Sequence, residues 1–558
     1  MKKLCLLVCA LLCVIVLIVS CGEGGVASST GGASTTESAV TTAQVTVGQT
    51  VADTTEAATL GSTSETTAQI AVVTTLETTA QTVAVTTVET TAGLLELIDG
   101  DEPVFQVVSS LEMFKSDFFS KQINEFCIAI REIGVTKPNY VYDQGRKMTY
   151  EILIGKTNRD VKIPVLEDLE WVVMVQGTKV IIDSATDYGL LDALEYFKTT
   201  YLSERNKTLT LPTNLCKIGK HDLVTSDEHN MTYAEMASKT MDAFNDAFWN
   251  KKGIDIGFWE AAEIIEIYAD AYELTKDEAI KEKLLSFADY FMLVNKQDWL
   301  WKNHNDSPMW ACIAFSRITL LTGKTKYYEV AKKNFDAVYE RSYDLTLGGG
   351  LYWDTDKTTK NACVNCPASI AAYYIAQISG DTSYYEKAKD LMDWTIENLY
   401  DKSNGKVADR YELQNGLKAG ASTYNQGTFI GACTMLYQIY KDEIYLAYAQ
   451  KATEYAMLYL TDSTYGVLDN RENGGDAALG FKGIFARWAR YYANVTNNVN
   501  IVLFLQYNAD VAYGHLNENG LIWTNWCTQT PADPVAEKHN AFSMCTALSL
   551  FYNCQLWQ

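Results

Sequence analysis

The sequence predicts an all-α main domain that follows a smaller α/β domain, and two observations carry this prediction. First, residues 231–558 contain about twelve apolar runs, each of which follows a period of 3.6 residues over two or more turns. Second, residues 103–218 combine short strand-like runs with two helical runs. The runs of the main domain lie near 231–250, 256–275, 277–295, 308–323, 325–342, 361–379, 381–399, 424–439, 442–459, 477–497, 499–513 and 538–553.

Twelve helices in hairpin pairs fit two architectures, a closed (α/α)6 barrel of six hairpins or an open helical solenoid. Solenoid repeats usually have a fixed period and short, uniform turns. Here alternate loops are long, Gly-rich and aromatic, and they span residues 303–309, 347–361, 404–425 and 470–483. Long loops that gather at one end of a barrel can build a site, so the sequence favours the barrel. We expect Gly323, Gly380 and Gly405 to end helices.

The smaller domain, residues 103–218, is expected to hold a helix over 116–133, a strand over 150–155 and a helix over 186–201. A hairpin of 171–176 and 179–183 should turn at Gly177-Thr178. The stretch Glu151–Arg159, together with the hairpin and the last helix, resembles the small α/β domain that precedes the catalytic domain of several glycoside hydrolases. That resemblance implies an accessory module without catalytic residues.

The N-terminus has the features of a secretory signal. Met1-Lys2-Lys3 precedes an apolar run from Leu4 to Val19. The last four positions of this segment, Ile18-Val19-Ser20-Cys21, resemble the bacterial lipobox, which implies cleavage before Cys21, lipidation of its sulfur and attachment to the outer face of the cell membrane. An ordinary signal peptide and a single-span anchor are the alternatives. We therefore assign residues 1–21 to the signal and 22–102 to a Ser/Thr-rich disordered stalk.

The composition limits the classes of partner and of site. The formal net charge is −23, and an acidic chain repels phosphate backbones, so nucleic acid is not expected as a partner. Only five His occur, and the single CxxC, Cys363 to Cys366, has no second pair and no nearby His. The sequence therefore predicts no metal site and no cofactor, whereas neutral sugars remain compatible with it.

Four stretches of the main domain share their order and spacing with a known family. They are Trp301–Ala311, Gly348–Trp353 with Asn361 and Asn365 after it, Thr423–Gly431, and Phe481–Arg487. Together they resemble glycoside hydrolase family 76, the α-1,6-mannanases, over about residues 231–556. The resemblance implies an (α/α)6 barrel, hydrolysis of internal bonds in an α-linked mannose polymer, and a polysaccharide or oligosaccharide as partner.

The family has two adjacent aspartates at the first motif, a nucleophile followed by an acid/base. Aligned by Trp310, the resemblance assigns the acid/base to Asp306, but Asn305 stands at the nucleophile position. An amide cannot form the usual glycosyl ester, so Asn305 departs from what the family's double-displacement mechanism requires. The residues also allow a plainer interpretation, because Asn-Asp-Ser-Pro is an ordinary helix start.

The remaining candidates are expected to bind substrate. Aromatic side chains could stack on sugar faces, amides could bond hydroxyls, and two cations could orient sugar oxygens. Core packing, local capping and ion pairing are the respective alternatives. The candidates are Trp301, Trp310, Trp353, Asn361, Asn365, Tyr424, Asn425, Gln426, Lys482 and Arg487.

Three functions stay open at this point. The first is a cell-surface α-mannan hydrolase, and the second is a glycan-binding lipoprotein that has lost the nucleophile. The third is a helical scaffold for protein partners, against which the aromatic, Asn-rich loops argue.

Overall fold

The computed structural model describes residues 93–202, 207–416, 418–468, 479–533 and 540–555. The predicted signal, Cys21 and nearly all of the predicted stalk lie outside these residues. Within the described ranges, no helix has the length and apolar character needed to span a bilayer.

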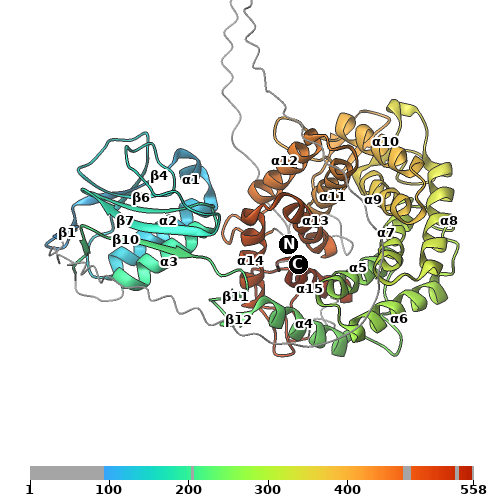
Figure 1. Cartoon of the computed structure of the whole chain (residues 1–558), viewed down its shortest axis with the longest axis horizontal. Helices are drawn as coiled ribbons and strands as arrows, with labels where there is room; N and C mark the ends of the chain where they lie inside the picture. The colour runs from blue at the N-terminus through green and yellow to red at the C-terminus, as the bar shows by residue number, and fades with distance from the viewer. Residues whose placement is uncertain (1–92, 203–206, 417, 469–478, 534–539, 556–558) are drawn as a thin grey trace, which may run out of the picture. The chain divides into compact units, whose positions relative to one another are not determined.

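The main domain is built from helices α4 to α15, which alternate between an outer and an inner ring (Figure 1). The outer helices are α4 (Tyr233–Phe248), α6 (Glu278–Asn295), α8 (Thr325–Ser342), α10 (Ser383–Asn398), α12 (Glu443–Tyr459) and α14 (Val499–Tyr513). The inner helices are α5 (Phe258–Thr275), α7 (Asp306–Thr322), α9 (Ala362–Ser379), α11 (Thr423–Tyr440), α13 (Phe481–Thr496) and α15 (Ala541–Asn553).

The inner ring is closed. Each inner helix packs against its two inner neighbours, and α15 packs against both α13 and α5. This closure confirms the predicted (α/α)6 barrel, because the first and last repeats of an open solenoid would not touch.

Burial follows from the sequence of each ring. Inner helices such as α9 are buried along most of their length, whereas outer helices such as α8 bury one face only. Glycines let inner helices approach closely. A Cβ atom at Gly427 of α11 would lie 2.7 Å from the Cα atom of Phe485 in α13, and one at Gly431 would lie 2.5 Å from the Trp488 ring.

Short turns and long loops alternate around the barrel. Gly323 and Gly380 end α7 and α9 with positive φ angles, as predicted. The prediction for Gly405 was wrong, because α10 already ends at Asn398. Gly405 lies in the following turn, where its φ of 87° brings the backbone against the Lys451 carbonyl.

Since each outer helix runs antiparallel to the next inner helix, the chain enters every inner helix from the same end of the barrel. The long loops therefore meet at this end, which we call the entry end. A small sheet joins two of them, with order β13 (Thr359–Asn361), β14 (Arg410–Glu412), β15 (Lys418–Ala419). A bridge between His304 and Asp354 joins a third loop to these.

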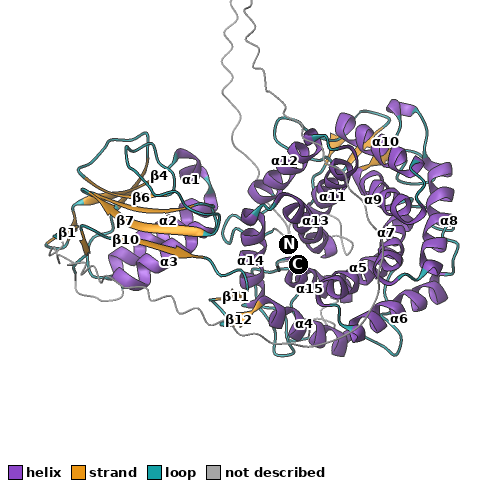
Figure 2. Ribbon diagram, viewed as in Figure 1, coloured by secondary structure: helices purple, strands orange, loops and turns teal. Residues whose placement is uncertain are grey.

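The smaller domain contains a six-stranded sheet of order β10-β7-β8-β6-β4-β5 (Figure 2). Its strands are β4 (Phe105–Ser109), β5 (Asn139–Tyr142), β6 (Tyr150–Ile154), β7 (Glu170–Gln176), β8 (Lys179–Ser184) and β10 (Cys216–Lys220). Strands β5, β4, β6 and β8 are parallel, whereas β7 and β10 are antiparallel to their neighbours. The expected β7–β8 hairpin turns at Gly177, whose φ is 61°.

Three helices accompany this sheet: α1 (Leu111–Lys115), α2 (Asp117–Glu132) and α3 (Gly189–Tyr201). The apolar faces of α2 and α3 share a core with one face of the sheet. Two-stranded pairs complete the described chain, formed by β1 (Leu94–Glu96) with β9 (Thr210–Pro212), β2 (Ile98–Asp99) with β3 (Glu102–Pro103), and β11 (Thr225–Ser226) with β12 (Met231–Thr232).

Candidate active site

Most of the predicted site residues come together at the entry end of the barrel. Asp306 begins α7, Asn361 and Asn365 belong to the start of α9, and Tyr424, Asn425 and Gln426 belong to the first turn of α11. Lys482 is the second residue of α13, and Trp353 lies in the loop before α9. Arg487 is the exception, because it lies deeper along α13.

Asp306 is a partly exposed carboxyl group with an ordered environment. Its Oδ2 atom accepts a hydrogen bond from Trp353 Nε1 at 2.9 Å and lies 3.5 Å from Cys363 Sγ. Its Oδ1 atom accepts from the Ser307 amide at 2.7 Å. Burial nevertheless raises the pKa of Asp306, against the lowering effect of the Trp353 and Ser307 bonds. The protonated form of Asp306 is thereby favoured, as a proton donor requires.

Asn305 points away from this environment and into the protein. It is 1% exposed. Its Nδ2 atom donates to the Tyr352 carbonyl at 2.9 Å, and its Oδ1 atom accepts from Arg341 Nε at 2.7 Å. Both ends of the amide are therefore satisfied by protein groups. This arrangement ties the start of α7 to the loop before α9.

A second carboxyl group near Asp306 was not singled out in the sequence. Asp409 is partly exposed and lies in the loop between α10 and α11. Its Oδ1 atom accepts from Asn425 Nδ2 at 2.7 Å and lies 3.4 Å from the Tyr424 hydroxyl. The Asp409 carbonyl also accepts from the Ala362 amide, which holds the loop against the start of α9. Only its three-dimensional neighbours distinguish it from other loop aspartates.

Tyr424 and Cys363 lie between the two carboxyl groups. Burial raises the pKa of Tyr424 well above its usual range, and the nearby Asp409 and Asp306 side chains add to this effect. Burial likewise raises the pKa of Cys363, with further contributions from Asp306 and Asp409. The Tyr424 hydroxyl and the Cys363 thiol are therefore neutral near pH 7. Because Asp306 and Asp409 both raise these two pKa values, both carboxyl groups lie near Tyr424 and Cys363.

The aromatic candidates differ in exposure. Trp353 is half-buried and stacks on His304, with ring centroids 4.4 Å apart. Trp301 is 56% exposed. Tyr424 stacks on Phe481 at 3.8 Å, and Trp310 is buried against Tyr424. Trp301 and Trp353 thus have surface left for a ligand, whereas Trp310 mainly supports Tyr424.

Several amide candidates fasten the entry loops. Asn365 accepts from the Leu351 amide and donates to the Leu351 carbonyl. Gln426, with its amide oriented to satisfy both ends, bonds Gly405 and Val407. By contrast, the Oδ1 atoms of Asn361 and Asn425 are buried and have no partner in the described structure. These two oxygens remain able to accept a hydrogen bond.

The two cationic candidates have protein partners. Lys482 Nζ lies 3.9 Å from the centre of the Trp526 ring and donates to the Leu468 carbonyl. Arg487 is buried inside the barrel, 2.8 Å from both Glu263 and Asp270 of α5. Since α5 and α13 are not neighbours in the ring, these ion pairs cross the barrel interior.

The described residues contain no group of three or more His, Cys, Asp or Glu side chains placed to hold a metal ion. Cys363 and Cys366 are both buried free thiols in the structure. What the entry end offers chemically is a pair of carboxyl groups, aromatic rings and amides, which suits general acid/base chemistry on a polar, uncharged ligand.

Comparisons with known proteins identify the family of the main domain. Residues 228–556 match the sequence profile described as glycosyl hydrolase family 76. The GH76A α-1,6-mannanase of Salegentibacter sp. HEL1_6 is 26% identical, with a TM-score of 0.53 over 57% of this chain and 98% of that chain. An inactive variant of that enzyme, with two aspartates changed to asparagine, was solved with α-1,6-mannotriose. It is also 26% identical, with a TM-score of 0.54 over 58% of this chain and 100% of that chain.

The Lin0763 protein of Listeria innocua shares the fold at 24% identity and a TM-score of 0.52, over 57% of this chain and 97% of that chain. A search of curated proteins found no match. The profile match covers more than half of the chain and contains all four motifs identified in the sequence. The chain therefore belongs to glycosyl hydrolase family 76.

Proposed function

We propose that this protein hydrolyses internal bonds of an α-1,6-mannan-type polysaccharide, with Asp306 as the proton donor. The observation that carries the proposal is the environment of Asp306, a partly exposed carboxyl group whose pKa is raised by burial at the entry end of the barrel. The 26% identical Salegentibacter family member is described as an α-1,6-mannanase, which supports the choice of substrate.

Asp409 is the second carboxyl group of the proposed reaction. Asn305 cannot serve, because its amide is buried and bonded at both ends. In the proposed step the Asp306 carboxyl gives its proton to the glycosidic oxygen as the bond to the anomeric carbon breaks. A water molecule attacks the same carbon and loses a proton to the Asp409 carboxylate. Carboxyl groups separated by a water need about 6.5–9.5 Å, more than the 5–5.5 Å of a direct nucleophile.

Contacts with Tyr424 and Cys363 support the assignment, because the charges of both carboxyl groups act on these two side chains. Asp409 lies 3.4 Å from the Tyr424 hydroxyl, and Asp306 lies 3.5 Å from Cys363 Sγ. The mechanism predicts inversion, so an α-linked substrate should first release a β-configured reducing end.

The test measures the release of reducing ends from α-1,6-mannan and the first-formed anomer by proton NMR. Asp306→Asn and Asp409→Asn should each lower kcat by at least a hundredfold, whereas Asp356→Asn, an exposed aspartate of the same loops, should not. Full activity in Asp409→Asn would refute its role. An α-configured first product would mean direct attack by a carboxylate instead.

Glycan binding without hydrolysis is the second candidate, and Asn305 is the observation that favours it. The inactive Salegentibacter variant with two asparagines in place of aspartates was solved with bound α-1,6-mannotriose, so family members can bind without turnover. Binding of mannotriose with no product after prolonged incubation would support this candidate. If neither the natural chain nor Asp306→Asn binds mannotriose, both candidate functions, hydrolysis and glycan binding, are refuted.

We also propose that the protein is attached to the outer face of the bacterial membrane through lipid on Cys21. The Ile-Val-Ser-Cys ending of the apolar run supports this proposal. Cys21→Ala should move the protein from the membrane fraction to the soluble or unprocessed fraction. Unchanged fractionation, with normal cleavage of the signal, would contradict a lipid anchor.

A further inference from the structure

The barrel buries three arginines, and one of them differs from the other two. Arg317 forms ion pairs of 2.6–2.9 Å with Glu266, Asp270 and Glu273, and Arg487 pairs with carboxylates of the same helix. Arg490, three residues further along α13, is 2% exposed. Within the described chain its Nε atom has no hydrogen-bond partner, and the ion pairs that hold Arg317 and Arg487 there do not include Arg490.

An unpaired buried cation is costly, because the protein interior solvates charge far less well than water does. Burial lowers the pKa of Arg490 to about 10, so the side chain still carries its charge at neutral pH. Charged side chains in proteins are almost never fully buried unless a group of opposite charge pairs with them. Arg490 therefore calls for an anionic partner from outside the described chain.

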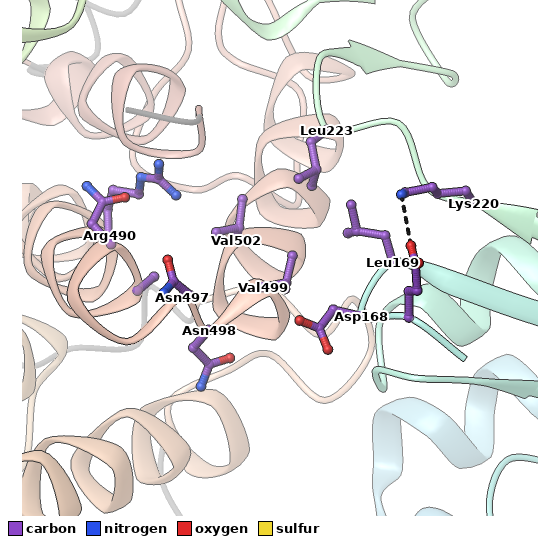
Figure 3. Close-up of a pocket in the computed structure, with 12 residues that line it drawn as sticks. Asp168, Leu169, Lys220, Leu223, Arg490, Asn497, Asn498, Val499 and Val502 are labelled. Atoms are coloured by element: carbon purple, nitrogen blue, oxygen red, sulfur yellow. Dashed lines mark hydrogen bonds and ion pairs between the residues drawn. The ribbon is translucent and has the colours of Figure 1, made fainter. Parts of the chain in front are cut away.

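Arg490 lines a pocket of about 900 Å³ at the end of the barrel where α13 turns into α14 (Figure 3). This end is opposite the entry end, because α13 begins at Phe481 beside the long loops and ends here. In Figure 3 the Arg490 side chain extends from α13 toward Val502 of α14 and Leu223. The volume lies within the range of about 300–1,000 Å³ that is usual for small-molecule sites.

The other walls combine amides with apolar side chains. Asn494, Asn497 and Asn498 contribute amide groups, and Asn498 makes no capping bond although it precedes α14. Val499 and Val502 form an apolar wall. Such a mixture suits a sugar ring, whose hydroxyls bond amides and whose C–H faces pack on aliphatic groups.

The acidic residues of the pocket limit how much negative charge it can take. Glu167 lies 3.5 Å from Lys220, so this pair is internally neutralised. Asp168 lies on the same wall. A polyanion would be repelled there, whereas a ligand with a single anionic group can place it on Arg490, away from that wall.

We propose that this pocket binds a sugar with one anionic group, a carboxylate or a phosphate, held by the guanidinium of Arg490. A guanidinium bonds either group through two parallel hydrogen bonds. The proposal does not depend on hydrolysis at Asp306, since the two sites lie at opposite ends of the barrel.

The test measures binding by isothermal titration calorimetry and thermal unfolding. The probes are mannose 6-phosphate, glucuronate, inorganic phosphate and mannose, each added to the mature full-length chain. We expect one of the two anionic sugars to bind and to raise the Tm, and Arg490→Met to weaken that binding at least tenfold. Mannose should not bind this site. Which anionic sugar binds distinguishes a phosphate from a carboxylate ligand.

Two further measurements keep the test decisive. Arg490→Met should fold and unfold at the same temperature as the natural chain or higher in ligand-free buffer, because it removes an unpaired charge. It should also leave mannan binding at the entry end unchanged. Failure of every anionic sugar to bind the natural chain would overturn the proposal. So would a clear fall in the Tm of Arg490→Met, which would mean that a protein group pairs with Arg490.

Discussion

Arg487 was a candidate sugar-binding residue, and its position now predicts a structural role that can be measured. Its guanidinium is 2.8 Å from both Glu263 and Asp270 and 4.0 Å from Glu266, inside the barrel. Breaking a buried ion pair on one side typically costs about 3–5 kcal/mol, because the other charge stays buried. We expect Arg487→Met to lower the free energy of unfolding by roughly this amount.

The other arginine of the cluster decides which carboxylate is left alone. Arg317 lies 2.8–2.9 Å from Glu266 and Asp270, so these two keep a cation when Arg487 is removed. Glu263 loses the cation that faces it. Burial already raises the pKa of Glu263 to about 7, against the lowering effect of Arg487. In Arg487→Met its pKa must therefore rise further.

The sign of the pH dependence follows from proton linkage. A carboxyl group whose pKa is higher in the folded state makes the protein less stable as pH rises. The loss begins at the pKa of the unfolded state, 4.5, and ends at the pKa of the folded state. Below pH 7 the natural protein and Arg487→Met lose the same free energy of unfolding as pH rises. Above pH 7 only the variant continues to lose stability, by up to about 1.4 kcal/mol per pH unit. The cost of Arg487→Met should thus be constant from pH 5 to 7 and should grow from pH 7 to 9.

Urea unfolding followed by Trp fluorescence at pH 6 and pH 9 measures this cost. Glu263→Gln in the Arg487→Met background should remove the extra loss at pH 9, and Arg490→Met is the matched arginine control without a carboxylate partner. A cost that is the same at both pH values would refute the assignment of Glu263. Unchanged stability with weakened mannotriose binding would restore the sugar-binding role of Arg487.

Three other outcomes follow from the structure. Trp353→Phe removes a hydrogen bond that lowers the pKa of Asp306, so this pKa should rise. In a pH–rate profile, the loss of hydrolysis at high pH should therefore shift to higher pH. A shift to lower pH would contradict the proton-donor role. Burial raises the pKa of Asp510 from 3.8 to about 6, so the natural protein should lose stability between about pH 4 and 6. Asp510→Asn should remove this loss, which is at most about 3 kcal/mol, as measured by urea unfolding. An unchanged pH dependence in the variant would exclude Asp510 as the source of the loss. Asn305→Asp should lower the free energy of unfolding by about 1–3 kcal/mol, because a carboxylate cannot donate the hydrogen bond that Asn305 gives to the Tyr352 carbonyl. It should not raise mannanase activity. A gain in kcat would show that this side chain can reach substrate.

The helical framework could be predicted from the sequence because its signals are local. All twelve helices of the barrel lie within a few residues of the expected runs, and the alternation of long and short loops favoured closure. Gly405 shows the limit of such reasoning. A glycine with positive φ serves a turn as well as a helix end, and the sequence alone does not separate the two.

The site was less predictable because side-chain direction depends on the packed structure. Arg487 lies in a family motif, yet it faces acids of a helix more than two hundred residues earlier in the chain. Asp409 lies in a loop without periodicity, and its relation to Asp306 arises only when β14 pairs with β13 beside the start of α9. Such long-range placement leaves no local trace in the sequence.

Asn305 and Asp306 illustrate how adjacent residues at a helix start come to have separate roles. Successive side chains on a helix point about 100° apart, so adjacent residues at a helix start can have different neighbours. Here the first side chain binds Arg341 and the Tyr352 carbonyl, and the second meets Trp353, Cys363 and solvent. An aspartate at position 305 could still accept from Arg341 but would lose the bond to the Tyr352 carbonyl. Because an amide replaces the first carboxylate of the family here, the hydrolysis that we propose uses Asp409 as its second carboxyl group.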